Sequence, residues 1–183
     1  MYKIIAIMGE AGTGKDTLMQ EVLKVHPFHE IVSCTTRPPR EGEVDGVNYH
    51  FLTNEEFAAR VLNDEMLEAT EFNNWFYGTG LESLSEDEIN IGVFNPTGIE
   101  SLLAHRDKVK VIVFRVYVSD KVRLIRQLNR ERDPDVHEII RRFKADWIDF
   151  DDLSDIPHIA ICNETLADLH AGVRTVLQAV EEL

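Results

Sequence analysis

A glycine-rich segment near the N-terminus constrains the fold more than any other feature of the sequence. Residues 3–8 (KIIAIM) form a short apolar run, residues 9–17 (GEAGTGKDT) carry three glycines ahead of a lysine, and residues 17–25 (TLMQEVLKV) have helical spacing. Glycines let backbone N–H groups converge as a nest for an anion, and Lys15 places an ammonium group on the β- and γ-phosphates. The segment therefore predicts a phosphate-binding loop between a strand and a helix N-terminus.

Further apolar runs alternate with helical patterns along the remaining chain. We expect strands at 30–34, 89–94, 109–118 and 159–162, and helices at 53–62, 119–129, 135–148 and 165–180. Such alternation predicts a mostly parallel sheet covered by helices on both faces, within one domain of 183 residues.

The charge balance limits the partners of the protein. Nineteen Lys and Arg against 33 Asp and Glu give a net charge of −14, which argues against binding to nucleic acid or to an anionic membrane surface. An anionic ligand must therefore be held locally, and eight of the 19 basic residues lie within residues 121–144. The acidic run 146–155 is interpreted as a solvated face.

The sequence lacks the patterns of a membrane span, a signal peptide, a disulfide framework and a zinc site. No apolar run reaches the length of a membrane span and the N-terminus has no signal-peptide pattern, so we expect a cytoplasmic protein. Cys34 and Cys162 form no C-x-x-C motif and the seven histidines have no ligand spacing, so neither a disulfide nor a zinc site is expected. A monomer and a dimer both remain open.

A second anion site is predicted within residues 33–51. Arg37 and Arg40 lie three residues apart on a loop that Pro38 and Pro39 stiffen. Two guanidinium groups can clamp one phosphate through bidentate, charge-assisted hydrogen bonds, with hydroxyl groups and a tyrosine nearby.

With this segment the sequence closely resembles the guanylate kinase family, over nearly the whole chain. The resemblance implies an α/β P-loop NTPase fold, with a mostly parallel central sheet flanked by helices, a mononucleotide-binding insert and a lid. The core would comprise about 1–32, 80–125 and 149–183, the insert about 33–79 and the lid about 126–148. The implied activity is transfer of the γ-phosphoryl group of Mg-ATP to GMP or dGMP, with Mg²⁺ and ATP required and small-molecule nucleotides as the partners.

The resemblance also assigns the site residues. ATP would contact Gly9, Glu10, Ala11, Gly12, Thr13, Gly14, Lys15, Asp16, Thr17, Arg126 and Asn163. GMP would contact Ser33, Arg37, Arg40, Tyr49, Glu68, Tyr77, Gly78, Thr79 and Asn95. Catalysis would fall to Lys15 and the lid arginines Arg130, Arg132, Arg141 and Arg142.

Two of these residues carry a specific chemical expectation. The Glu68 carboxylate would accept the adjacent N1–H and N2–H₂ donors of guanine, a pair that adenine does not offer. Asn163 would lie near the ATP base, or else would be a helix N-cap. Because the lid is about a residue shorter than usual, the sequence does not decide between Arg130 and Arg132 as its first arginine.

Three positions depart from the family pattern. Asp16 replaces the usual Ser or Thr after the lysine, and it is either a Mg²⁺ ligand or an acid that complements the helix dipole. Val93 and Asn95 replace two acids, which affects both the Mg²⁺ arrangement and the guanine contact. The alternatives are a kinase for a deoxynucleoside or modified-base monophosphate and, in another class, a non-catalytic phosphopeptide-binding module of the same fold. The glycine loop with Lys15 argues against the module.

Overall fold

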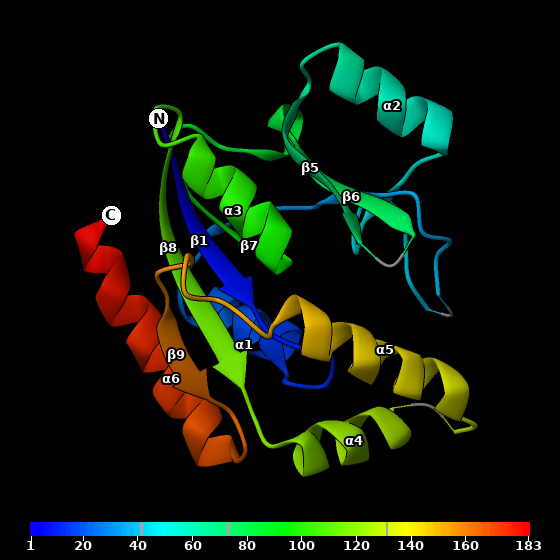
Figure 1. Ribbon diagram of the computed structural model, residues 1–183. Helices are drawn as coiled ribbons and strands as arrows, with labels where there is room; N and C mark the ends of the chain where they lie inside the picture. Colours follow the sequence, from blue (N-terminus) through cyan, green and yellow to red (C-terminus); the bar gives the residue numbers. More distant parts are fainter. Residues whose placement is uncertain (41, 73, 131) are drawn as a thin grey trace.

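A five-stranded parallel sheet is the larger of two sheets in the computed structural model, which describes residues 1–40, 42–72, 74–130 and 132–183 (Figure 1). Glu41 of the predicted phosphate clamp and Glu131 of the predicted lid lie outside these residues. The strand order is β2 (His29–Glu30), β7 (Ile89–Val93), β1 (Tyr2–Met8), β8 (Val109–Tyr117) and β9 (Ile159–Cys162). All four pairings are parallel, which confirms the predicted sheet.

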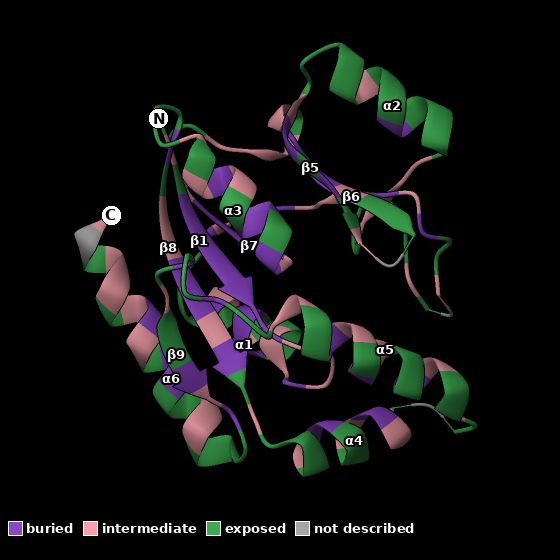
Figure 2. Ribbon diagram, in the orientation of Figure 1, coloured by how far each residue is buried: buried purple, intermediate pink, exposed green. Residues whose placement is uncertain are grey.

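Helices cover both faces of this sheet because its central strand is apolar on both sides. Ile4, Ala6 and Met8 pack in a core cluster with residues of α3 (Pro96–Ala104). Ile5 and Ile7 pack in a second cluster with residues of α1 (Lys15–Val25) and α6 (Leu166–Ala179). Figure 2 shows this buried band along β1. A strand buried on both faces lacks polar alternation, as β1 does.

Residues 34–80 form a second, smaller sheet. Its order is β4 (His50–Phe51), β3 (Cys34–Thr35), β6 (Trp75–Gly80) and β5 (Met66–Phe72), and β5 and β6 are an antiparallel pair. Helix α2 (Asn54–Leu62) contacts this pair and begins at the predicted capping box of Thr53 and Glu56. Helix α3 contacts both β8 and β5 and thereby connects the two sheets.

Two further helices follow the carboxyl end of β8. Helices α4 (Asp120–Leu128) and α5 (Val136–Asp149) contact each other, and α5 lies between α4 and the β5–β6 pair in the view of Figure 1. The side chain of Asp135 caps α5 by accepting a hydrogen bond from the Glu138 amide. Short 3₁₀ turns occupy Leu81–Ser83 and Val180–Glu182. In the described part of the chain, no helix has both the length and the apolar character of a membrane span.

One predicted strand is wrong. The apolar run at 30–34 is divided between β2, in the large sheet, and β3, in the small sheet. The amide of Ile31 still donates to the carbonyl of Ile91 beside β2, whereas Cys34 pairs with Gly78 in the other sheet. The run is apolar because it crosses between two sheets, and it is not one continuous strand.

Candidate active site

The predicted phosphate-binding loop connects β1 to α1 at the carboxyl end of the central strand. Gly12 and Gly14 have φ values of 85° and 84°, a left-handed conformation that favours glycine. A Cβ at Gly14 would also lie 2.6 Å from Nδ2 of Asn163. Gly14 is the N-cap of α1 and makes no side-chain capping bond, so the first amides of the helix, including those of Asp16 and Thr17, have no side-chain cap.

Side chains from distant parts of the sequence hold the carbonyl groups of this loop. Thr13 O accepts hydrogen bonds from Arg126 at 3.0 Å and from Asn163 Nδ2 at 2.8 Å. Arg126 also donates to the carbonyl of Asn163 at 2.7 Å. The N-cap of α6 is Thr165, with a capping box to Asp168, so the alternative of Asn163 as a helix N-cap is wrong. Arg126 and Asn163 thus both contact the loop backbone, and their predicted contact with ATP stays a prediction.

Lys15 and Asp16 lie side by side at the start of α1. Lys15 Nζ is 3.6 Å from Asp16 Oδ2, and the Asp16 side chain is 75% exposed. The Lys15 ammonium group is the main cause of a lowered pKa at Asp16, and Arg130 adds to it, so the carboxylate is ionised at neutral pH. Among the described residues no three His, Cys, Asp or Glu side chains form a metal-binding group.

Arg37 and Arg40 occupy the loop between β3 and β4. The buried Arg37 side chain donates to Glu43 at 2.9 Å and to the carbonyl of Pro38 at 2.7 Å, and it lies over the ring of Tyr49. The amide of Arg40 donates to the same Glu43 carboxylate. Burial lowers the pKa of the Arg40 guanidinium, and so do the cationic groups of Arg142, Arg37 and Arg130. Arginines from three segments are therefore close enough to affect the pKa of Arg40.

Tyr49 and Tyr77 lie next to this cluster, with their ring centroids 6.1 Å apart. Burial raises the pKa of Tyr49 to about 12, so its phenol keeps its proton and can donate a hydrogen bond. Tyr77 and Gly78 belong to β6 and pair with β3 at Thr35 and Cys34. Ser33 directly precedes β3, and its carbonyl accepts a hydrogen bond from the amide of His50.

Glu68 is a buried carboxyl group on β5, at 6% exposure. The hydroxyl of Thr79, its cross-strand partner, donates to Glu68 Oε1 at 2.8 Å. Burial raises the pKa of Glu68 to about 7 despite this hydrogen bond. The carboxyl group is therefore poised between its neutral and ionised forms near physiological pH.

Asn95 lies close to this carboxyl group but serves the scaffold. It is the N-cap of α3: its Oδ1 accepts from the amide of Gly98 at 2.6 Å, and its Nδ2 donates to Thr70 Oγ1 at 3.1 Å. A Cβ at Gly98 would lie 3.4 Å from Glu68 Oε2, so this cap lies against Glu68. Val93 ends β7 and packs on the apolar core.

The predicted lid arginines lie on α5 and in the connection between α4 and α5. Arg141 and Arg142 both donate to Glu138, one turn earlier on α5, at 2.6 to 2.8 Å. These hydrogen bonds, led by Arg141, lower the pKa of Glu138 to about 2. Arg130 and Arg132 are both exposed, and Arg130 lies close enough to affect the pKa values of Asp16 and Arg40.

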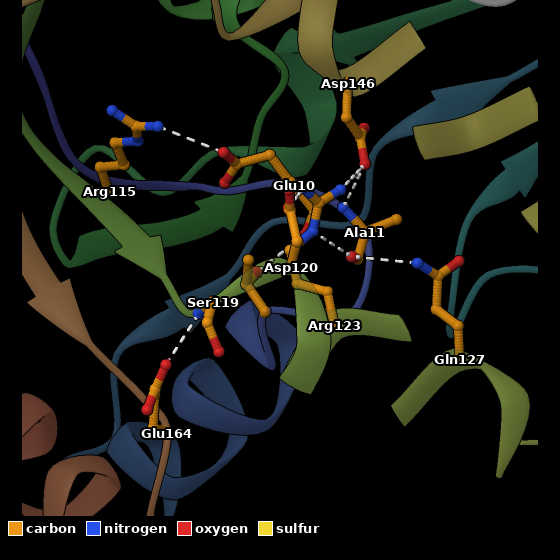
Figure 3. A network of polar contacts seen from close by, with 10 residues as sticks. Glu10, Ala11, Arg115, Ser119, Asp120, Arg123, Gln127, Asp146 and Glu164 are labelled. Carbon is orange, nitrogen blue, oxygen red and sulfur yellow. Dashed lines mark hydrogen bonds and ion pairs between the residues drawn. The ribbon is translucent and has the colours of Figure 1, made fainter. Parts of the chain in front are cut away.

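One group of buried charged residues at the base of the loop was not predicted from the sequence. Asp146 is buried at 5% exposure and forms an ion pair with Arg123, and both contact Ala11 (Figure 3). Asp146 is therefore not part of a solvated acidic face. Glu10 is paired with Arg115 at 3.2 Å on the other side of the loop. Arg123 and Gln127, four residues apart in the sequence, lie on the buried face of α4.

Comparisons with known proteins identify the relatives of this chain. The family model described as guanylate kinase matches residues 1–146. A guanylate kinase of Clostridium perfringens is 34% identical over 180 residues, covering 96% of this chain and 82% of that protein. A guanylate kinase of Streptococcus agalactiae is 41% identical over 114 residues, covering 61% of this chain and 54% of that protein.

The fold is also similar to that of a solved structure. The crystal structure of guanylate kinase from Anaplasma phagocytophilum matches with a TM-score of 0.71 at 20% identity, covering 98% of this chain and 86% of that chain. At this identity the match supports the fold alone.

Proposed function

The chain belongs to the guanylate kinase family, and on this premise we propose that it transfers the γ-phosphoryl group of Mg-ATP to GMP, giving ADP and GDP. One observation carries the proposal: the phosphate loop faces a second cluster of anion-binding groups. Asp16 affects the pKa of Tyr49, and Arg130 and Arg142 affect that of Arg40, so the groups assigned to the two nucleotides lie within electrostatic reach. A phosphoryl donor and its acceptor must be brought together in this way.

ATP would bind the loop of residues 9–17. The first amides of α1 and the Lys15 ammonium group would hold its β- and γ-phosphates, while Arg126 and Asn163 keep the loop carbonyls turned away from them. Asp16 would hold Mg²⁺ together with phosphate oxygens and water, since it is ionised and exposed and Mg²⁺ needs few protein ligands. The bound ion would neutralise phosphate charge.

GMP would bind between the small sheet and α5. Arg37, Arg40, Tyr49 and Tyr77 would hold its phosphate, and Ser33 and Gly78 would line the same strand ends. Glu68 would accept the N1–H and N2–H₂ donors of guanine, with Thr79 and Asn95 beside it. Arg37 must exchange part of its contact with Glu43 for the phosphate.

The transfer itself would need no covalent enzyme intermediate. An oxygen of the GMP phosphate attacks the γ-phosphorus of ATP, the bond to the β-phosphate oxygen breaks, and ADP leaves. Lys15, Arg130, Arg141 and Arg142 would stabilise the charge on the transferring group, with Arg130 favoured over Arg132 because it reaches Asp16 electrostatically.

These roles assign three regions to the chain. We propose a core of about 1–32, 80–125 and 149–183, a mononucleotide-binding region of about 33–79 and a lid of about 126–148. A cytoplasmic location, where both substrates occur, is part of the proposal.

Product analysis tests the proposal. Purified protein incubated with Mg-ATP and GMP should yield ADP and GDP in equal amounts, as separated by ion-exchange chromatography. Omitting GMP should abolish ADP formation. ADP without GDP would identify an ATPase and contradict the proposal, and so would an absence of turnover.

A further inference from the structure

The backbone N–H and carbonyl of Ala11, at the tip of the phosphate loop, are both held by side chains of helices α4 and α5. Its N–H donates to Asp146 Oδ2 at 3.0 Å. Its carbonyl accepts from Arg123 Nε at 3.0 Å and from Gln127 Nε2 at 3.3 Å. Figure 3 shows these contacts, in which side chains from two separate helices meet at the backbone of one loop residue.

Arg123 and Asp146 are also bound to each other, in a buried setting. A second guanidinium nitrogen of Arg123 donates to Asp146, and a third donates to Asp120 at 3.0 Å. The side chains of Arg123 and Asp146 are 3% and 7% exposed. The guanidinium group lies 4.3 Å from the ring centroid of Phe143, so its plane is fixed by packing as well as by hydrogen bonds.

Such a pair is a poor device for stability alone. Removing two charges from water costs about as much free energy as their attraction returns, and apolar residues of similar volume often serve the fold equally well. Such a pair does fix the orientation of the groups that it contacts, because a guanidinium fork and a carboxylate can hold a carbonyl and an N–H in one arrangement. Here the residue so held precedes Lys15 by only four residues.

The two helices that hold Ala11 also carry the predicted lid arginines. Arg126 lies on α4, and Arg130 lies just after the end of that helix. Arg141 and Arg142 lie on α5. Asp146 lies one turn after Arg142 on the same helix. The position of the loop is therefore linked by short, buried contacts to the helices that carry these arginines.

We propose that Arg123 and Asp146 are positioning residues that hold the phosphate loop in its ATP-binding conformation and link it to the lid helices. This inference rests on the proposed function, since it assigns ATP to the loop. Neither residue would touch the nucleotide; both would act through the backbone N–H and carbonyl of Ala11. The rival hypothesis is that the Asp146 carboxylate competes with an ATP phosphate for the Ala11 N–H. In that case removal of the Asp146 side chain would tighten ATP binding.

The test removes both charges together. The double variant Arg123→Leu, Asp146→Ala leaves no unpaired buried charge and should fold with a melting temperature at or above that of the wild type. Calorimetric titration with an ATP analogue that has an imido group between the β- and γ-phosphorus atoms should show an affinity about tenfold weaker, since the loop loses charge-assisted contacts. The KM for GMP should stay unchanged while kcat falls.

Two further variants complete the design. Arg123→Lys keeps a charge opposite Asp146 but cannot contact Ala11, Asp120 and Asp146 at once, so its ATP affinity should also fall although its folding is conserved. Arg60→Leu with Glu82→Ala removes an ion pair of the small-sheet region and should leave ATP affinity unchanged.

The outcomes separate this inference from the proposed function. A wild type that fails to bind the analogue contradicts the proposed function. The positioning role is overturned if the wild type binds the ATP analogue and the folded Arg123 variants bind it equally well or more tightly. Should the double variant not fold, Arg123→Lys decides alone.

Discussion

The buried carboxyl group of Glu68 should make GMP binding depend on pH. Its burial raises its pKa to about 7 in the free protein, with Thr79 as the side-chain donor to it. Only the ionised carboxylate can accept both N1–H and N2–H₂ of guanine, because the neutral acid carries a proton of its own. GMP should therefore select the ionised form and displace a proton.

The size of the effect follows from this pKa. With a pKa of about 7, roughly nine-tenths of the Glu68 groups are ionised at pH 8 and roughly one-tenth at pH 6. Affinity scales with the competent fraction, so the dissociation constant for GMP should rise about tenfold from pH 8 to pH 6, which is about 1.4 kcal/mol. At pH 7 binding should release about half a proton.

Calorimetry in two buffers of different ionisation enthalpy measures both quantities. The GMP phosphate itself titrates with a second pKa near 6, so Glu68→Gln supplies the background that the phosphate contributes. The variant should bind GMP more weakly at pH 8 and should lose the component of the pH dependence centred near 7. Equal slopes in wild type and variant, or proton uptake by the wild type at pH 7, would show that GMP does not select the ionised form of Glu68.

The remaining predictions concern the phosphates and the metal. Lys15→Ala should reduce kcat by a factor on the order of 100 or more while the melting temperature stays within a few degrees, as activity assays and thermal scans will show. Arg142→Ala should lower kcat more than it changes the KM for GMP, whereas Arg37→Ala should chiefly raise that KM; steady-state kinetics with the reverse pattern would exchange their roles. Asp16→Asn should raise the Mg²⁺ concentration needed for half-maximal rate several-fold, and superimposable titrations would exclude Asp16 as a ligand.

Local signals make the phosphate loop and the helix starts predictable. The roles of Gly12, Gly14 and Lys15 depend only on the left-handed backbone of the loop and on the charge that it carries, both of which are local to the segment. The capping boxes are equally local, and α2 begins where Thr53 and Glu56 predict. The parallel sheet follows from apolar runs long enough to be buried on both faces.

The small sheet is harder to predict because its strands lack a regular pattern. The pairing of β5 with β6 contains a register shift between Met66 and Glu68, and β6 carries Gly78, where a Cβ would lie 2.6 Å from a carbonyl of the neighbouring strand. Helix α3 begins with Pro96 and contains Gly98, residues that are typical of turns.

The Arg123–Asp146 pair escapes prediction for a different reason. Its partners are 23 residues apart on different helices, and Asp146 begins a run of acids most of which are exposed. Which acid of an acidic run is buried depends on tertiary packing, so a local sequence pattern does not predict it. The residue-by-residue site assignments, including those taken over from the family resemblance, stay predictions.

A comparison of acceptor nucleotides tests whether the protein is a kinase that selects guanine through Glu68. kcat/KM should be measured with Mg-ATP for GMP, dGMP, IMP, AMP and a pyrimidine monophosphate. If Glu68 recognises guanine, GMP should be the best ribonucleotide, IMP should be poor because it lacks the 2-amino donor, and AMP should be poorer by several orders of magnitude. AMP or the pyrimidine nucleotide used as well as GMP would contradict the guanine assignment, and a clear preference for dGMP over GMP would make the protein a deoxynucleotide kinase of the same fold.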